Sequence, residues 1–511
     1  MSHGLLQRYE HQPFVSCLAG LYGCQWKHYK RSHFAVLVAA FCLTLLFLYF
    51  WGQAKNDYND FDWWIGILVS LMVSVIAMAV LSNLWSKEWR TLLLSFQVTA
   101  PFLHVGGVLL MTSLAWPVAL HFFRMKSTGE SQMRLIVAVY LTVLLSLYLV
   151  PLGLYSPCIK EKGTLGPAPA LIGHRGAPML APENTLMSFE KAVEAGCDGL
   201  ETDVTISFDG VPFLMHDYTL QRTTNIHEVF PNRTNTPAAR FTWNELESLN
   251  AGDWFLSHNP FGTAGSLNAD DRQRAGNQSV CSLQAFLQLA AQTGKLVIFD
   301  LYRPPRDHPF RDTWIQRTLE VIQNESSIHS SQVLWLPSNL RALVQELDPE
   351  LQQTSGSRLP LEELQSNHIV KLNLDYTSMS AELIREYTAV NITTNLYVIS
   401  QPWLYSLAWC AGVHSVTTNA PQLLSTISSP LFIMSPDEYK LMWILTDLMS
   451  FVLILLIFFF HRWKTHTRTH TYLASNTSNL YSDVILSDIW SVSSGNSAAE
   501  KMPSLAAVTE H

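Results

Sequence analysis

Long apolar stretches stand near both ends of this chain, with a region of mixed polarity between them. Five stretches have the roughly 20 mostly apolar residues that a membrane-spanning helix needs. They cover residues 34–51, 63–84, 101–123, 135–155 and 441–460. Tryptophan and tyrosine gather at several of their ends, as is typical of the interfacial belts of membrane helices. The pattern predicts a transmembrane region with four spans at residues 34–155, and a further span at residues 441–460.

The middle region alternates between strand-like and helix-like runs from residue 169 onward. Strand-like runs cover residues 170–173, 200–206, 212–215, 296–301, 333–336, 371–374, 396–399 and 416–418. Helix-like runs lie between several of them, at residues 185–195, 282–292, 313–322, 339–347 and 381–387. Such alternation predicts a parallel sheet covered by helices.

The length of this region, about 260 residues, suits a closed (β/α)8 barrel of the TIM type. An open, doubly wound sheet is the alternative, but no glycine-rich dinucleotide-binding pattern follows the first strand. The predicted fold class is therefore α/β, with a TIM-type (β/α)8 barrel at residues 156–440 inserted between transmembrane helices.

The composition agrees with this division. Hydrophobic residues make up 48% of the 511 residues and charged residues 14%, whereas charged residues are about a quarter of an ordinary soluble chain. The net charge of −8 includes no basic block, so no nucleic-acid partner is predicted. The chain is predicted to be an integral, multi-pass membrane protein.

Basic residues beside the spans predict the orientation of the middle region, because loops rich in Lys and Arg stay in the cytoplasm. Such residues follow the last span and precede the fourth: Arg462, Lys464 and Arg468, and Arg124, Lys126 and Arg134. Both groups place residues 156–440 outside the cell. The N-terminal segment, residues 1–33, gives conflicting signals, since its own basic residues indicate the cytoplasm while four spans before an outside region place it outside.

Four Asn-X-Ser/Thr sequons agree with an outside location and predict N-glycosylation of the middle region. They lie at Asn232, Asn277, Asn324 and Asn391. The same region has four cysteines, enough for up to two disulfides: Cys158, Cys197, Cys281 and Cys410. Cys197 directly precedes a strand-like run, so a buried thiol fits it equally well.

The C-terminal part of the chain raises two further points. Residues 461–511 are rich in Ser, Thr and Asn, which predicts a disordered cytoplasmic tail. Asp447 lies inside the last span. It is either a functional residue of the membrane region or a hydrated residue close to one helix end.

Titratable residues fall at the ends of several predicted strands, where barrel enzymes carry their chemistry. His174 and Arg175 follow the first strand, and Glu201 and Asp203 lie in the second. Residues i and i+2 of a strand share a face, roughly 6.5 Å apart. Two acids on one face of an apolar strand are costly unless something neutralises them. A divalent cation such as Ca²⁺ or Mg²⁺, which takes oxygen ligands, does so.

Two further residues extend this group, namely His216 after the third strand-like run and Asp300 at the end of the fourth. Alone, a histidine there is more often structural and an aspartate is more often a helix cap. Glu183 fits a helix start as well as a functional role. Together the residues favour phosphoryl chemistry, because a metal and Arg175 stabilise phosphate charge while one histidine accepts a proton and the other donates one.

The motifs around these residues identify a resemblance. They are His174-Arg-Gly-Ala-Pro, Glu201-Thr-Asp-Val and His216-Asp, followed by Asn250-Ala-Gly-Asp-Trp-Phe and Gly412-Val-His-Ser-Val-Thr-Thr-Asn. In order and spacing, residues 169–425 resemble the glycerophosphodiester phosphodiesterase family. With the flanking spans, the chain resembles its multi-span eukaryotic branch, in which the catalytic domain is extracellular.

The resemblance implies roles for individual residues. His174 and His216 match the family's acid–base pair, Arg175 its phosphate-binding arginine, and Glu201, Asp203 and Asp300 its metal ligands. Two departures lie on the substrate-binding side, where Arg303 and Tyr397 are expected to contact substrate. The family usually has a lysine where this chain has Tyr302, followed by Arg303, and a tryptophan where it has Tyr397. The branch is also expected to have six spans, five of them before the barrel.

The implied function is metal-dependent hydrolysis of phosphodiesters at the cell surface, most simply at the plasma membrane. The substrates would be glycerophosphodiesters or glycosylphosphatidylinositol anchors, cleaved as by a phospholipase C through attack by a hydroxyl of the substrate. Two enzymatic alternatives are a lysophospholipase D and a hydrolase of soluble glycerophosphoinositol or glycerophosphocholine. A non-catalytic surface protein that binds a partner is an alternative of another class.

Overall fold

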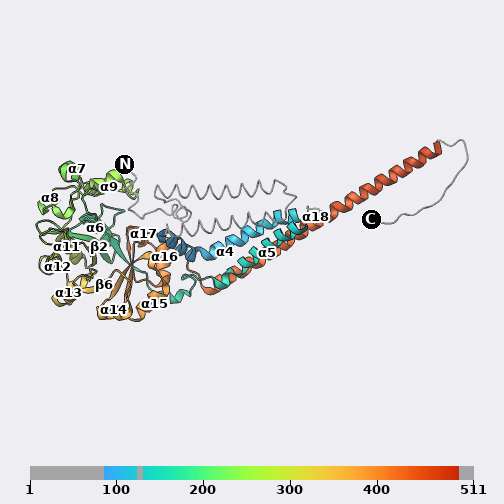
Figure 1. Ribbon diagram of the computed structural model, residues 1–511. Helices are drawn as coiled ribbons and strands as arrows, with labels where there is room; N and C mark the ends of the chain where they lie inside the picture. Colours follow the sequence, from blue (N-terminus) through green and yellow to red (C-terminus); the bar gives the residue numbers. More distant parts are fainter. Residues whose placement is uncertain (1–85, 124–129, 494–511) are drawn as a thin grey trace. The chain divides into compact units, whose positions relative to one another are not determined.

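The computed structural model describes residues 86–123 and 130–493. Eight parallel strands close into a barrel, in which the last strand pairs with the first. They are β1 (Ala170–His174), β2 (Gly199–Ile206), β4 (Leu296–Leu301), β5 (Val333–Trp335), β6 (Gln352–Ser355), β7 (Lys371–Asp375), β8 (Thr393–Tyr397) and β9 (Ser415–Thr418). Helices surround these strands (Figure 1). The predicted TIM-type (β/α)8 barrel is confirmed.

The structure corrects the prediction of the eight barrel strands at two places. Residues 212–215 contain β3 (Pro212–Leu214), which runs antiparallel to β2 and extends the sheet beside the barrel. The eighth strand of the barrel is instead β6 (Gln352–Ser355), whose sequence is entirely polar. Hydrophobic patterning does not detect such a strand, because it contains no apolar residue even though Gln353, Thr354 and Ser355 are buried.

Hydrogen bonds fix β6 from the layer of helices and join its neighbouring strands inside the barrel. The guanidinium of Arg341 donates to the side-chain oxygen of Gln353 at 2.7 Å and to the carbonyl of Thr354 at 2.8 Å. Asn395, which is fully buried, donates to Asn373 at 2.7 Å and to the Thr417 hydroxyl at 2.8 Å. This half of the barrel interior is therefore a polar network.

The opposite half of the interior is apolar, and the larger core lies outside the barrel. Ile172, Ile298 and Leu334 form the small apolar cluster inside it. The outer core fills the space between strands and helices, with large side chains such as Phe189 and Trp335. The layered arrangement leaves the C-terminal ends of the strands free to carry polar side chains.

Helices follow most strands, as in other barrels of this type. Those around the barrel are α6 (Leu186–Glu194), α11 (Leu283–Thr293), α12 (Trp314–Glu320), α13 (Arg341–Leu347), α14 (Leu361–Ser366), α15 (Ala381–Ala389), α16 (Pro402–Ala411) and α17 (Pro421–Leu424). The excursion between β3 and β4 holds α7 (Ile226–Val229), α8 (Trp243–Glu247), α9 (Asp253–His258) and α10 (Ala269–Gly276). Thr185 caps α6 by accepting a hydrogen bond from the backbone of Ser188.

Three further helices are long and apolar enough to cross a membrane. They are α4 (Ser86–Phe122), α5 (Glu130–Gly153) and α18 (Pro436–Ser493), with candidate spans at Leu93–Phe122, Arg134–Gly153 and Pro436–Arg468. These helices indicate association with a membrane and contain the spans predicted at residues 101–123, 135–155 and 441–460, apart from a residue or two at the ends. The spans predicted at residues 34–51 and 63–84 lie outside the described residues.

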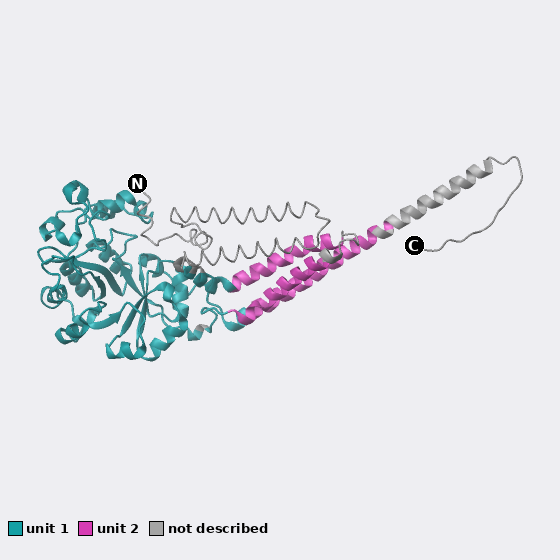
Figure 2. Cartoon of the chain, viewed as in Figure 1, with its two compact units in different colours: residues 1–100, 155–439 teal, residues 101–154, 440–511 magenta. Residues whose placement is uncertain are grey.

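The chain divides into two compact units, which Figure 2 colours separately. The first contains residues 1–100 and 155–439, so it includes the barrel and the beginning of α4. Within this unit Leu94 and Val98 of α4 are buried in the outer core, and the hydroxyls of Thr91 and Tyr376 share a hydrogen bond of 2.9 Å. The start of α4 is therefore part of the barrel domain.

The second unit contains residues 101–154 and 440–511, and polar side chains join its described helices. Trp443 donates to Asp447 at 2.6 Å, and the same carboxylate lies 3.8 Å from the ring of His104. Ser450 shares hydrogen bonds with Thr112 at 2.6 Å and Tyr148 at 2.8 Å. Asp447 is thus part of a network between helices rather than a hydrated residue at a helix end.

The prediction of a disordered tail is wrong for residues 461–493, because α18 continues to Ser493. Hydroxyl groups in this part satisfy backbone carbonyls one turn earlier. Thr465 donates to the carbonyl of His461 and Thr467 to that of Trp463, each at 2.9 Å. A sequence rich in Ser, Thr and Asn is therefore helical here. Residues 494–511 lie outside the described part of the chain, as do residues 1–33.

The segments that lead into and out of the barrel domain are joined to each other. A disulfide links Cys158 to Cys410, 252 residues apart. Beside it, the backbone of Met434 pairs with Cys158 and Lys160 through two hydrogen bonds of 3.0 Å. Cys197 and Cys281 are buried free thiols. Of the two disulfides that the four cysteines of this region could form, one is therefore present. Cys197 is a buried thiol, which is the alternative that its position before a strand-like run had left open.

Candidate active site

The registers of three neighbouring strands bring the predicted site residues to one edge of the barrel. His174 ends β1 and stands beside Glu201 of β2, while Asp203 of β2 stands beside Asp300 of β4. Because the strands are parallel, their C-terminal ends meet at the same face, where barrel enzymes carry their catalytic groups. The candidate site is therefore assembled by strand pairing itself.

Glu201, Asp203 and Asp300 form a compact acidic cluster, since each offers an oxygen and all these oxygens lie within 4.8 Å of one another. Glu201 and Asp203 are buried, whereas Asp300 is exposed. Burial, followed by repulsion from the other two acids, raises the pKa of Glu201 well above its usual range. Although Asp300 as a residue is exposed, desolvation of its carboxyl group and then the charge of Asp203 raise its pKa to about 6. A cluster in which two of the acids resist ionisation fits a hard divalent cation.

A tight turn after β1 aims Arg175 at these acids. Arg175 (φ 54°) and Gly176 (φ 87°) both adopt left-handed backbone conformations. A Cβ on Gly176 would collide with Ser188 of α6, so only glycine fits this approach. The turn directs the backbone N–H of Arg175 to Glu201 at 3.0 Å, and its guanidinium lies 3.0 Å from Asp203.

Glu183 links Arg175 to a second buried arginine. Its carboxylate accepts hydrogen bonds from Arg175 at 3.1 Å and from two nitrogens of Arg222, the longer at 2.9 Å. Arg222 also donates to Asp217 at 2.8 Å. Glu183 is only 4% exposed. The reading of Glu183 as a simple helix-start residue is therefore replaced by a role as the bridge between two arginines.

Each candidate histidine is oriented through its Nδ1 atom. Nδ1 of His174 lies 2.6 Å from the side-chain oxygen of Asn419, the residue that follows β9. An amide oxygen only accepts, so Nδ1 carries the proton and Nε2 has a free lone pair. Burial, and then the charge of Arg175, lower the pKa of His174 to about 4. His174 is therefore neutral near pH 7.

His216 is exposed and paired with an acid. Its Nδ1 lies 2.8 Å from Asp217. Although burial raises the pKa of Asp217, hydrogen bonds from His216 and Arg222 hold it below its usual range. A carboxylate that stays ionised keeps the proton on Nδ1 and leaves Nε2 available for proton transfer.

The two residues expected to contact substrate lie differently. Tyr397 ends β8 at the same edge of the barrel, beside Asp375 of β7. Arg303 follows β4, but its guanidinium bonds to Asp312 at 2.8 Å and to the carbonyl of Arg311 at 3.2 Å. In the described part of the chain these bonds direct Arg303 away from the acidic cluster.

Sequence reasoning did not assign roles to several residues that the structure brings into the site. Asn184, Asp217, Arg222 and Asn419 orient the charged groups, and Tyr302 donates to Asp203 at 3.0 Å. For Asp217 and Asn419, their position within the motifs quoted above was the available signal. A polar residue that acts on another side chain gives no pattern of its own in a single sequence.

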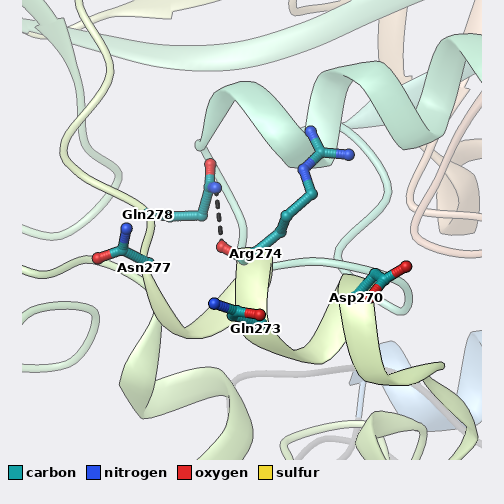
Figure 3. A pocket seen from close by; sticks show the side chains of 5 residues that line it. All are labelled: Asp270, Gln273, Arg274, Asn277 and Gln278. Carbon is teal, nitrogen blue, oxygen red and sulfur yellow. Dashed lines mark hydrogen bonds between the residues drawn. The ribbon is translucent and has the colours of Figure 1, made fainter.

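A separate hollow lies on α10 and has a volume of about 360 Å³ (Figure 3). It is lined by Asp270, Gln273, Arg274, Asn277 and Gln278. Arg274 forms an ion pair with Glu190 of α6. None of its lining residues belongs to the acidic cluster, and one of them is a predicted glycosylation site.

The family is evident from comparison with known proteins. Residues 174–422 match the model of the glycerophosphoryl diester phosphodiesterase family. Human glycerophosphodiester phosphodiesterase domain-containing protein 5 is 46% identical, over 90% of this chain and 86% of that protein. Mouse glycerophosphoinositol inositolphosphodiesterase GDPD2 is 40% identical, over 87% of this chain and 93% of that protein.

Among solved structures, a phosphodiesterase of Oleispira antarctica in complex with the product sn-glycerol-3-phosphate is 22% identical, with a TM-score of 0.41 over 51% of this chain and 96% of that chain. The protein described here is a phosphoric diester hydrolase. It belongs to the glycerophosphoryl diester phosphodiesterase family, whose members generally depend on a divalent metal.

The bridge through Glu183 leads to a stability prediction. Replacing it (Glu183→Ala) leaves two buried arginines without their shared partner, so the free energy of unfolding should fall by about 3–5 kcal/mol. The measurement is a urea titration of the solubilised full chain, followed by tryptophan fluorescence. Glu194→Ala is the matched control, because Glu194 is exposed and its partner Lys191 keeps a second acid, Asp271, so loss of this pair costs at most about 1 kcal/mol. Equal effects of the two changes would contradict the assigned bridge.

The raised pKa of Asp300 leads to a prediction about pH. In the metal-free protein Asp300 carries a proton up to about pH 6, and cation binding requires the ionised carboxylate. Affinity for Mg²⁺ or Ca²⁺ should therefore weaken by about tenfold between pH 7 and pH 5, as calorimetric titration would measure. Asp300→Asn should bind more weakly at pH 7 and depend less on pH. A wild-type affinity that is constant over this range would refute the assignment.

Proposed function

We propose that this chain is a cell-surface enzyme that uses Ca²⁺ or Mg²⁺ to cleave glycerophosphodiesters or glycosylphosphatidylinositol anchors in a phospholipase-C-like manner. One observation carries the proposal: the three clustered carboxylates lie beside two oriented histidines and an arginine at the open end of the barrel. A cation held by Glu201, Asp203 and Asp300 would stabilise charge on the phosphate oxygens.

The two histidines take complementary parts in the proposed reaction. Neutral His174 accepts a proton at Nε2 from a substrate hydroxyl that lies next to the phosphodiester. That hydroxyl oxygen attacks phosphorus, and the bond from phosphorus to the leaving oxygen breaks. His216, which enters this step with protons on both ring nitrogens, donates the one on Nε2 to the leaving oxygen, and a cyclic phosphate results, which water can open. Arg175 supports the phosphate charge. The substrate thus supplies the nucleophile.

The membrane helices favour a lipid-linked substrate. The barrel domain is connected at both ends to helices that can cross a membrane, α5 before it and α18 after it. It is therefore tethered close to a lipid surface, where anchored molecules present their phosphodiesters. Hydrolysis of soluble glycerophosphoinositol is the second candidate, favoured by the name of the mouse relative.

The reaction is tested by comparing the full chain with His174→Ala and His216→Ala. Expressed on cells, the wild-type protein should release an anchored reporter, and each variant should lose at least about 100-fold in rate, the contribution of a general acid or base. Product analysis on glycerophosphoinositol, glycerophosphocholine and lysophosphatidylcholine separates the alternatives. Release no greater than that of the variants would exclude anchor cleavage. Absence of both hydrolysis and divalent-cation binding would favour a non-catalytic surface protein.

The outside location is tested by glycosylation. Asn232, Asn277, Asn324 and Asn391 are all exposed on the barrel domain, and a glycan on Asn277 would occupy the hollow on α10. Protein made in mammalian cells should lose apparent mass on treatment with a glycosidase that removes N-linked glycans, and each Asn→Gln change should remove one step. A protein whose mass does not change would place residues 156–440 on the cytoplasmic side or leave these sites unused. Protease protection in intact cells then distinguishes the two outcomes.

A further inference from the structure

Tyr302 lies directly above the acidic cluster because the pairing of β2 and β4 continues one residue past the end of β4. Its backbone N–H donates to the carbonyl of Val204 at 2.8 Å. Successive side chains of a strand alternate between faces, so Tyr302 shares a face with Asp300, two residues before it. Asp203 of β2 is the register partner of Asp300. The strand register thus places Tyr302 at the rim of the barrel, next to Asp203.

The tyrosine hydroxyl completes the hydrogen bonding of one metal-ligand candidate. It donates to Oδ1 of Asp203 at 3.0 Å. The other oxygen, Oδ2, lies 3.2 Å from the side-chain nitrogen of Asn184 and 3.0 Å from Nε of Arg175. Both oxygens of Asp203 therefore have protein partners, which restrict the orientation of the carboxylate.

The other two acids of the cluster are held less completely. Glu201 accepts a backbone hydrogen bond from Arg175 on one oxygen, and among the described residues no side chain is seen to donate to Asp300. Each oxygen of a carboxylate has two lone pairs, so Oδ1 of Asp203 can accept from the tyrosine and still bind a cation. Because the phenol is neutral, it orients the carboxylate without reducing the negative charge that attracts the cation.

We propose that Tyr302 is a positioning residue, which holds Asp203 in the orientation that binds the divalent cation. The inference rests on the metal site of the proposed function. Hydrogen-bond partners of metal ligands typically change metal affinity or activity by 10–100-fold when they are removed. Tyr302 also stacks edge-on against His216, with ring centroids 6.4 Å apart, so its ring and its hydroxyl have separable contacts.

The test removes the hydroxyl alone. In the solubilised full chain, Tyr302→Phe should raise the dissociation constant for Mg²⁺ or Ca²⁺ by about tenfold in calorimetric titrations. The ring remains, so KM for substrate at saturating metal should stay within about twofold. Tyr218→Phe is the matched control, because Tyr218 is an exposed tyrosine near His216 and its hydroxyl has no hydrogen bond to the described residues; its metal affinity should equal that of the wild type.

Thermal melting in chelator checks that both variants are folded, and Tyr302→Leu, which also lacks the hydroxyl, should weaken metal binding at least as much. An affinity within twofold of the wild type in Tyr302→Phe would overturn the inference, as would a wild-type protein that binds no divalent cation. If cation affinity falls in Tyr302→Phe but the wild-type protein hydrolyses no phosphodiester, the inference stands and the proposed function is refuted.

Discussion

Mutual repulsion among three carboxylates is the constraint on which the rest of this site depends. Glu201, Asp203 and Asp300 cannot all ionise within 4.8 Å of one another unless positive charge is supplied. Arg175 supplies part of it from the turn after β1. In the proposed function a divalent cation supplies the remainder of the positive charge. The need to balance this negative charge also accounts for the neighbouring residues, since Glu183 forms an ion pair with Arg175, which in turn contacts the acids.

A series of hydrogen-bonded charged side chains connects the acidic cluster to His216. From Arg175 it passes through Glu183, Arg222 and Asp217 to His216. His174 is not part of this series of charged side chains and is oriented by the neutral amide of Asn419. The two histidines therefore differ in electrostatic surroundings as well as in burial, which suits a pair in which one accepts a proton and the other releases one.

The sequence predicted much of this arrangement, because apolar strands followed by charged residues are visible in a single chain. The acidic residues of β2 and β4 were found in this way. β6 was not, since Gln353, Thr354 and Ser355 are buried but polar and resemble a polar loop. The roles of Arg222 and Tyr302 depend on Glu183 and Asp203, which are distant in the sequence, and only the fold reveals them. The extent of α18 beyond residue 460 was likewise missed, because a polar composition is shared by disordered tails and exposed helices.

The segments that lead into and out of the barrel domain lie side by side, held by the backbone pairing of Met434 with Cys158 and Lys160, while the disulfide from Cys158 to Cys410 ties the entering segment to α16. A folded domain whose two ends meet behaves as a cassette within its host chain. The barrel can therefore be regarded as an insertion in the connection between α5 and α18, two helices that would otherwise be joined by an ordinary short loop. Exchange of such a domain would still have to preserve the packing of α4, whose Leu94 and Val98 are buried in the outer core of the barrel domain.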